Sequence, residues 1–138
     1  SIWDSGWQGG TNTGTIERMI PAAKMLNGIR EIRATSKGFD VSFFHPVDSK
    51  KATDAQLWSL QGYTRSWGGS YATPDSDRHT LTPEKIDVSE DKKSVSIIAG
   101  PLKAGYVYEI SIKSPLDDSS LENFWPSEGH YSMKAVPE

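Results

Sequence analysis

The sequence predicts an all-β protein, an immunoglobulin-like antiparallel β-sandwich of about seven strands. Three observations lead to this fold class. Apolar and polar residues alternate through residues 94–98 and 106–112, which is the period of a half-buried strand. Turn signals recur at the spacing of roughly 8–12 residues that is typical of such sandwiches. A tyrosine, Tyr106, directly follows Gly105 at the start of a strand, where many sandwiches place a corner tyrosine.

The stretch from residue 86 to residue 112 is predicted to hold two antiparallel strands joined by a Gly-Pro-Leu-Lys-Ala-Gly corner. Val95, Ile97 and Ala99 share one face of the first strand. The second strand has a longer row on one face: Tyr106, Tyr108, Ile110 and Ile112. We expect the Tyr106 hydroxyl to bond back to the preceding loop while its ring packs inward.

The chain is expected to have two parts, an extended lead-in over residues 1–27 and the sandwich over residues 28–138. The lead-in is rich in glycine and carries Trp3 and Trp7. It reads either as a segment that packs on something else or as the end of a preceding domain. Residues 15–20 resemble a short strand, residues 22–26 a helical turn, and Asn27-Gly28 a tight turn.

The remaining elements follow in order. Residues 29–35 and 39–44 form a predicted hairpin around Lys37-Gly38, with Phe39, Val41 and Phe43 on one face. A polar loop over 49–54 precedes a strand within 55–66, which has Trp58 and Leu60 on the core side. Residues 67–83 are expected to be a long loop, of the kind that is more often functional or mobile than without a role. Beyond the stretch described above come a polar loop (114–122), an aromatic plug (123–126) and a last strand (130–136).

Composition excludes several classes of function. The 138 residues suffice for one domain, and the formal net charge is −3 with a pI near 5.6. Scattered basic residues on a mildly acidic chain argue against a nucleic-acid partner, which requires a clustered positive field. No stretch is apolar for long enough to insert into a membrane. The chain has no cysteine, which excludes disulfides, thiol catalysis and cysteine-ligated metals.

Several stretches of the sequence resemble a known family. Residues 6–14 (GWQGGTNTG) and 39–43 (FDVSF), which run into Pro46-Val47-Asp48, are similar to the region after the β-propeller in exported glucose/sorbosone dehydrogenase-like bacterial proteins, many of which carry a c-type cytochrome domain. Residues 88–95 and 102–110 resemble the same region, and they resemble bacterial Ig-like repeats in general. The resemblance implies an exported accessory module, periplasmic or extracellular, beside a catalytic domain.

The search for catalytic chemistry gives a negative prediction. His45, His79 and His130 lie on different expected elements, so no metal site is predicted. Asp75 and Asp77 have the spacing of calcium ligands but lack the glycine and the distal glutamate of such loops. No nucleophile elbow or haem-attachment motif is present. We therefore expect no enzyme activity, no catalytic residues and no cofactor.

The aromatic residues divide into two groups. Trp58, Tyr106, Tyr108 and Trp125 are expected in the core or at a corner. The candidate binding residues lie in or beside the long loop: Tyr63, Trp67, Tyr71, Asp75, Asp77, Arg78 and His79. Flat rings beside polar groups suit a glycan, and they equally suit a hot spot that grips a neighbouring domain. The sequence leaves both possibilities open.

The sequence thus predicts a non-catalytic accessory module of a larger exported protein. Its expected partner is the neighbouring catalytic domain, with carbohydrate binding as the leading specific activity. The alternative is a domain that completes the active site of an exported sugar oxidoreductase or docks its electron-transfer partner.

Overall fold

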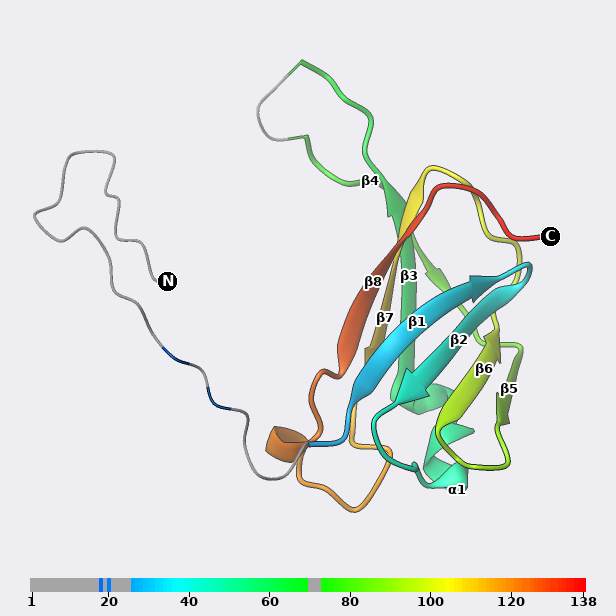
Figure 1. Ribbon diagram of the computed structural model, residues 1–138. Coiled ribbons are helices and arrows are strands. Elements are labelled where there is room, and N and C mark those ends of the chain that lie inside the picture. The colour runs from blue at the N-terminus through cyan, green and yellow to red at the C-terminus, as the bar shows by residue number, and fades with distance from the viewer. Residues whose placement is uncertain (1–17, 19, 21–25, 70–72) are drawn as a thin grey trace, which may run out of the picture.

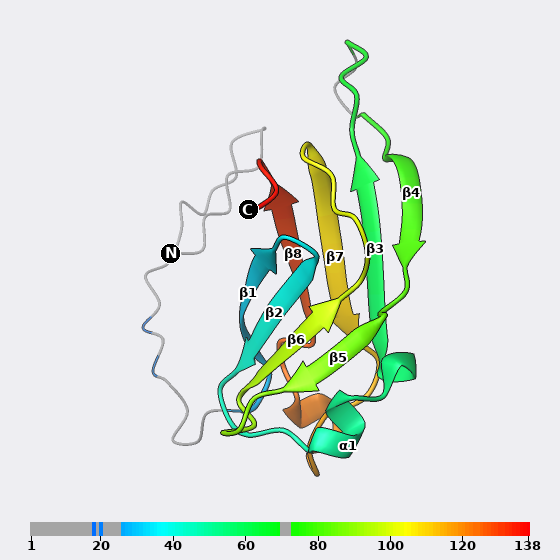
Figure 2. The same ribbon diagram turned by 90° about the vertical axis from the view of Figure 1, so that its right-hand side faces the viewer.

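Segments in which apolar and polar side chains alternate form strands, and these make two antiparallel four-stranded sheets packed face to face (Figures 1 and 2). The structure, a computed structural model, describes residues 18, 20, 26–69 and 73–138. The strand orders are β1-β2-β6-β5 in the first sheet and β4-β3-β7-β8 in the second. The strands in these residues are β1 (Ile29–Thr35), β2 (Gly38–Phe43), β3 (Trp58–Thr64), β4 (Ser76–Leu81), β5 (Lys85–Val88), β6 (Ser94–Ile98), β7 (Tyr106–Ile112) and β8 (Glu128–Met133).

The core lies between the two sheets, where the predicted apolar faces meet. The inner face of the first sheet supplies Phe39, Val41, Phe43, Val95 and Ile97, which are at most 2% exposed. The second sheet supplies Trp58, Leu60, Tyr108, Ile110 and Ile112. Burial of each such side chain stabilises the fold by about 1.5–3 kcal/mol relative to leaving it in water. The all-β sandwich predicted from the sequence is confirmed, with eight strands in the described residues.

The predicted pairing of residues 94–98 with 106–112 is wrong. Strand β6 pairs with β2 and β5, whereas β7 pairs with β3 and β8, so the two strands belong to different sheets. The Gly-Pro-Leu-Lys-Ala-Gly segment therefore crosses the sandwich from one sheet to the other. Gly100 and Gly105 have φ values of 83° and 82°, which glycine adopts without steric cost. Leu102 between them is buried and fastens the crossing to the core.

Two predicted loops contain regular structure. Within the long loop predicted over 67–83, residues Ser76–Leu81 form the edge strand β4, and β5 follows directly. The predicted polar loop over 49–54 contains the short helix α1 (Ser49–Ala52) and leads into a 3₁₀ turn, η1 (Ala55–Leu57). Asp48 caps α1 by accepting hydrogen bonds from the backbone N–H groups of Lys50 and Lys51.

The corner tyrosine is Tyr108, two residues later than predicted. Its hydroxyl accepts a hydrogen bond of 2.7 Å from the backbone N–H of Lys103, in the segment that crosses between the sheets. Its ring is 1% exposed and packs against Phe39 with ring centroids 5.4 Å apart. The Tyr106 hydroxyl instead donates to Asp77 on β4. One strand face therefore presents both tyrosines, but only the deeper one reaches back to the crossing segment.

The predicted tight turn at Asn27-Gly28 is wrong. Asn27 is instead a buried residue whose side chain and backbone bond to segments distant in the sequence. Its side-chain oxygen accepts from the backbone N–H groups of Gly28 (3.0 Å) and His45 (2.9 Å), and its Nδ2 donates to Asp117 Oδ2 (2.7 Å). Its backbone forms a parallel bridge with Phe124. These bonds fix the start of β1 to two loops that lie far apart in the sequence.

The predicted aromatic plug over residues 123–126 is confirmed for Phe124 and wrong for Trp125. Phe124 is 2% exposed and packs against Phe43, with ring centroids 6.2 Å apart. Trp125, expected in the core, is 69% exposed, because neighbouring residues of an extended segment point to opposite sides. It lies between the 3₁₀ turn η2 (Leu121–Asn123) and β8. The strand and helical turn predicted over 15–20 and 22–26 lie largely outside the described residues, as do Trp3 and Trp7.

Replacement of Tyr108 by phenylalanine should destabilise the domain more than the same change at Tyr106. Tyr108→Phe leaves the partly buried N–H of Lys103 without its acceptor, which costs about 1–3 kcal/mol. Tyr106→Phe removes a bond at the exposed side chain of Asp77, where water takes the place of the hydroxyl. Urea unfolding of both variants measures the difference. Equal midpoints would contradict the assignment of Tyr108 as the corner residue.

Asn27→Ala should cost about 2–3 kcal/mol, because two backbone N–H groups lose their acceptor and Asp117 loses a donor. Thermal and urea unfolding of the full chain test this. Asn123→Ala is a suitable control, because the Asn123 side chain donates only to the nearby Ser120 hydroxyl at the surface. If Asn27→Ala lowered the free energy of unfolding no more than the control does, the hydrogen bonds of Asn27 would not be important for stability.

Candidate functional site

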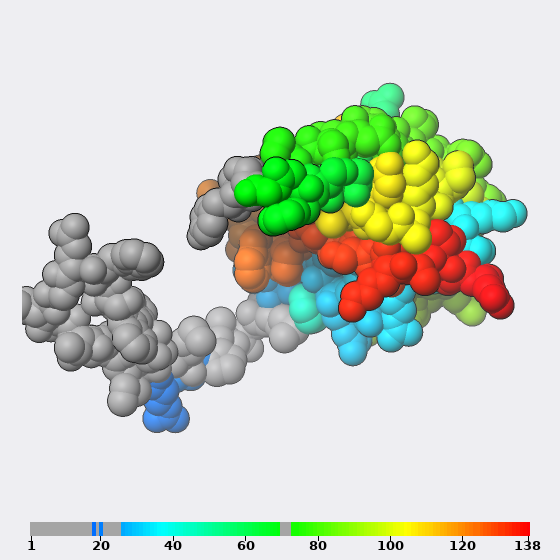
Figure 3. All heavy atoms as spheres, turned by 90° about the horizontal axis from the view of Figure 1, so that it is seen from above, coloured from blue at the N-terminus to red at the C-terminus, as the bar shows by residue number. Residues whose placement is uncertain are grey.

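The predicted binding residues are divided between three places. Tyr63 lies on β3, and Asp77, Arg78 and His79 lie on β4. Trp67 and Asp75 belong to the connection between these strands, which extends beyond the end of the sheets (Figures 1 and 2). Tyr71 lies outside the described residues. Figure 3 looks onto this end of the sandwich, where the β3–β4 connection (green) lies beside the β6–β7 crossing (yellow) and the C-terminal residues (red).

The outer face of the second sheet carries a network of paired charges. Asp75 accepts hydrogen bonds of 2.7 Å from both Arg65 and Arg78. Arg78 also donates to Gln61 Oε1 (2.6 Å) and lies 3.3 Å from Glu109 Oε2. Each of these charges therefore has a partner of opposite sign, on the connection for the two arginines and, across β3, on β4 for Glu109.

Tyr63 is not available as a flat stacking surface. Its side chain is 8% exposed and stands outside the central core cluster. The guanidinium of Arg78 lies over its ring, 4.4 Å from the centroid, and that of Arg65 lies 5.7 Å away. These are cation–π distances, so the two arginines cover the ring that the sequence suggested for ligand binding.

Asp77 and His79 point to the other face of β4 and meet the crossing segment. Asp77 has a φ of 51°, and its carboxylate accepts a short hydrogen bond of 2.5 Å from the Tyr106 hydroxyl. The ammonium of Lys103 lies 3.8 Å from the same carboxylate and 5.2 Å from the Tyr106 ring. The His79 ring packs edge-on against Tyr106 at 5.8 Å. This cluster links the edge strand β4 to the β6–β7 crossing.

Trp67 has a different environment from the other predicted residues. It is 83% exposed, the highest value among the large apolar side chains of the described residues. Below it, the Arg65–Asp75 ion pair and a bond from the Ser76 hydroxyl to the Thr64 carbonyl (3.1 Å) join the two sides of the connection. The β3–β4 connection thus carries an exposed indole ring, and hydrogen bonds join its two sides next to the sheet.

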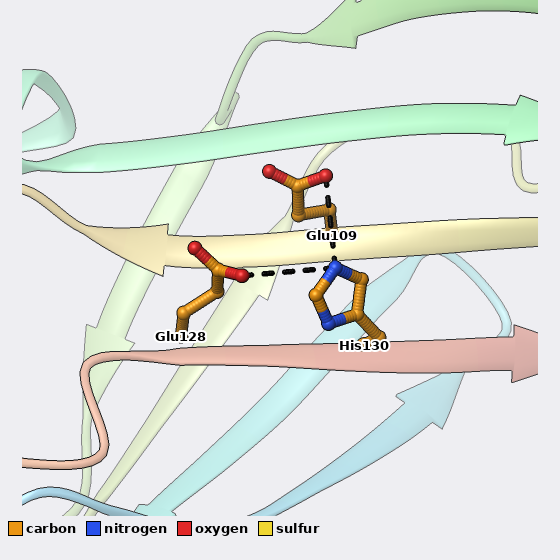
Figure 4. Close-up of side chains that lie close together, drawn as sticks. All are labelled: Glu109, Glu128 and His130. Carbon is orange, nitrogen blue, oxygen red and sulfur yellow. Dashed lines mark ion pairs between the residues drawn. The ribbon is translucent and has the colours of Figure 1, made fainter. Parts of the chain in front are cut away.

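The structure brings together three possible metal ligands that the sequence did not predict to be neighbours. Glu109 on β7 and Glu128 and His130 on β8 bring one ligand atom each to within 4.8 Å of one another (Figure 4). In the strand predicted over residues 106–112, Glu109 falls on the face opposite the row of Tyr106, Tyr108, Ile110 and Ile112. The missing information was that β8 pairs with β7 in the register that sets His130 opposite Glu109.

The first sheet has a shallow polar hollow of about 610 Å³ on its outer face. It is lined by charged and serine side chains of the four strands and the β5–β6 turn, among them Arg33, Asp40, Asp87 and Ser96. Among the predicted binding residues that the structure describes, none lines it.

The ion pairs shift the acidities of their members. Hydrogen bonds from Arg78 and Arg65 hold the pKa of Asp75 below its ordinary value of 3.8. The hydrogen bond from Tyr106 likewise lowers the pKa of Asp77 and raises that of Tyr106 above 10.0. Both carboxylates are therefore ionised and both arginines charged at neutral pH. These ion pairs stabilise the fold. The pKa values of Asp75, Asp77 and Tyr106 are shifted away from 7, whereas a general acid or base works best with a pKa near the working pH.

Comparisons with known proteins place the fold. No protein-family model and no curated protein matches the chain. Solved structures of the S-layer protein SbsC are similar. Its rSbsC(31-844) crystal structure is 20% identical with a TM-score of 0.56, over 78% of this chain and 14% of that one. The structure of its domains 1-6 is 23% identical with a TM-score of 0.55, over 80% and 14%. The crystal structure of its N-terminal part is 21% identical with a TM-score of 0.54, over 78% and 24%.

The chain therefore matches between one seventh and about one quarter of the length of these structures. At this identity the likeness concerns the fold, and it agrees with the sandwich described above. The resemblance to sugar-dehydrogenase-associated regions stays a prediction. In the described part of the chain, no helix is long and apolar enough to cross a membrane.

The Asp75 ion pairs should make stability depend on pH in the acid range. Because folding lowers the pKa of Asp75, the pairs stabilise the fold above the unfolded pKa of about 3.9 and lose this effect as the pH falls through the folded pKa. Asp75→Asn should lower the unfolding midpoint at pH 7 and reduce its decline between about pH 5 and pH 2. Midpoints of thermal unfolding against pH measure both. Glu122→Gln, at an exposed position, is the control, and identical pH profiles for wild type and Asp75→Asn would contradict the prediction.

Proposed function

We propose that this domain is a non-catalytic interaction module of a larger exported protein and that the β3–β4 connection around Trp67 is its binding element. The observation that carries the proposal is a contrast in environment. Trp67 is 83% exposed, whereas Asp75, Asp77 and Arg78 already have hydrogen-bond partners within the domain. Interfaces are commonly anchored by a tryptophan that is buried on binding.

The comparisons support the wider setting. The similar structures belong to a bacterial surface-layer protein that has at least six domains, as one of their titles states. This chain matches a fraction of that protein. A sandwich of this kind as one unit of an exported, multi-domain protein is consistent with both the fold and the accessory role expected from the sequence.

Two kinds of partner suit an exposed indole. A glycan can stack the C–H face of a sugar ring on it, and a neighbouring domain of the same polypeptide can bury it in a pocket. The covered ring of Tyr63 removes a second stacking surface on β3, which leaves the neighbouring domain as the favoured partner and a glycan as the second candidate.

Trp67→Ala should weaken binding roughly tenfold or more, because a stacked ring contributes about 0.5–1.5 kcal/mol beyond its buried area and each 1.4 kcal/mol is one decade. Binding is measured on a glycan array and against the separately expressed remainder of the natural polypeptide. The unfolding midpoint should not change, since the ring lies outside the core.

Trp125→Ala provides a matched control. Trp125 is also an exposed tryptophan, and its segment, between η2 and β8, lies at the other end of the sheets (Figure 1). The proposal requires that Trp125→Ala bind as wild type does. Equal binding by wild type and Trp67→Ala, or loss of binding only in Trp125→Ala, would show that the connection is not the site.

A further inference from the structure

The second sheet presents three side chains with the chemistry of zinc ligands, and the proposed interaction site does not use them. His130 Nε2 lies 3.7 Å from Glu109 Oε2 and 3.7 Å from Glu128 Oε1 (Figure 4). All three ligand atoms fall within 4.8 Å of one another. Imidazole nitrogen and carboxylate oxygen are both common ligands of Zn²⁺.

The backbone places these side chains on one face in a fixed register. Glu128 and His130 are two residues apart on β8, so they point to the same side of the sheet. Glu109 lies directly opposite His130 on β7, in a ladder that is continuous from Tyr106 to Ser111. Side chains on paired strands lose less freedom on metal binding than side chains on a loop, which favours a preformed site.

The spacing fits a single small ion. Zinc bonds of about 2.0–2.2 Å to nitrogen and oxygen place neighbouring ligands of a tetrahedral site roughly 3.3–3.6 Å apart. The two distances of 3.7 Å to His130 need only small side-chain rotations to reach that value. Glu128 and His130 are about half exposed, so both can rotate and water can take the remaining coordination position.

Near these three ligands, the outer face of the second sheet carries more carboxylates than arginines. Three carboxylates, those of Asp75, Glu109 and Glu128, face two arginines, Arg65 and Arg78. Asp75 engages both arginines at 2.7 Å, whereas Glu109 lies at 3.3 Å from Arg78. For Glu128 the ion pair in the structure is with His130, which is itself one of the three possible ligands. A divalent cation would neutralise this surplus without breaking the Asp75 pairs.

We infer that Glu109, Glu128 and His130 form a surface binding site for one divalent transition-metal ion, with Zn²⁺ preferred. His130 would bind through Nε2 and each glutamate through one carboxylate oxygen. Because the ligands come from two strands, the ion would cross-link β8 to β7 and stabilise the last strand of the sheet.

The experiment is a titration of the full chain, purified without a histidine tag, with ZnCl₂ by isothermal calorimetry at pH 7.5, together with thermal unfolding. We expect saturable binding of one ion per chain and a rise of the unfolding midpoint with zinc concentration. Glu128→Gln and His130→Asn should each weaken binding roughly tenfold or more and abolish the rise of the midpoint. Both positions are exposed enough for the variants to fold.

Glu90→Gln is the control, since it removes an exposed carboxylate in the turn between β5 and β6 and should bind zinc as wild type does. MgCl₂ titrations show the contribution of the imidazole, because Mg²⁺ prefers oxygen ligands. The inference is overturned by the absence of saturable binding, by zinc affinity that is equal in wild type and both ligand variants, or by Mg²⁺ binding as tightly as Zn²⁺.

Discussion

The architecture depends on the contacts that Tyr108 makes between the two sheets. Its ring reaches across the sandwich to Phe39 on β2, and its hydroxyl holds the backbone of Lys103 in the segment that carries the chain between sheets. Gly62 makes room for it, because a Cβ atom there would lie 2.9 Å from the Tyr108 ring. One side chain thus contacts both the facing sheet and the segment that connects the two sheets.

The outer face of the second sheet inherits its pattern from this arrangement. With Tyr108 pointing inward, Glu109 must point outward, and the register sets Gln61 on one side of it and His130 on the other. Arg78, from the edge strand β4, reaches this row and closes over Tyr63. The position of Glu109 in both the charged network and the group of possible metal ligands therefore follows from strand order, and all three possible metal ligands lie on paired strands.

Local sequence pattern determined which residues face the core, and it failed where distant strands decide the structure. Alternation predicted the buried rows of β2, β3, β6 and β7, because the pleat imposes a period of two on any half-buried strand. It could not predict the sheet to which β6 or β7 belongs. The edge strand β4, with the sequence SDRHTL, reads as a loop because only Leu81 in it is buried. Asn27 meets Asp117 across ninety positions of sequence, a contact that no local signal contains.

The pairing of the predicted polar residues also bears on the proposed binding element around Trp67. A partner that covered the Arg65–Asp75–Arg78 network would remove water from charges that already have their hydrogen bonds, and such desolvation is costly unless the partner supplies better ones. Burial of Trp67 breaks no bond, since its ring lies in solvent. The network has a second consequence: the Arg65–Asp75 pair fastens the two ends of the connection, which lowers the entropy that binding would have to remove. In the proposed site, the Arg65–Asp75 pair therefore supports the connection that carries Trp67.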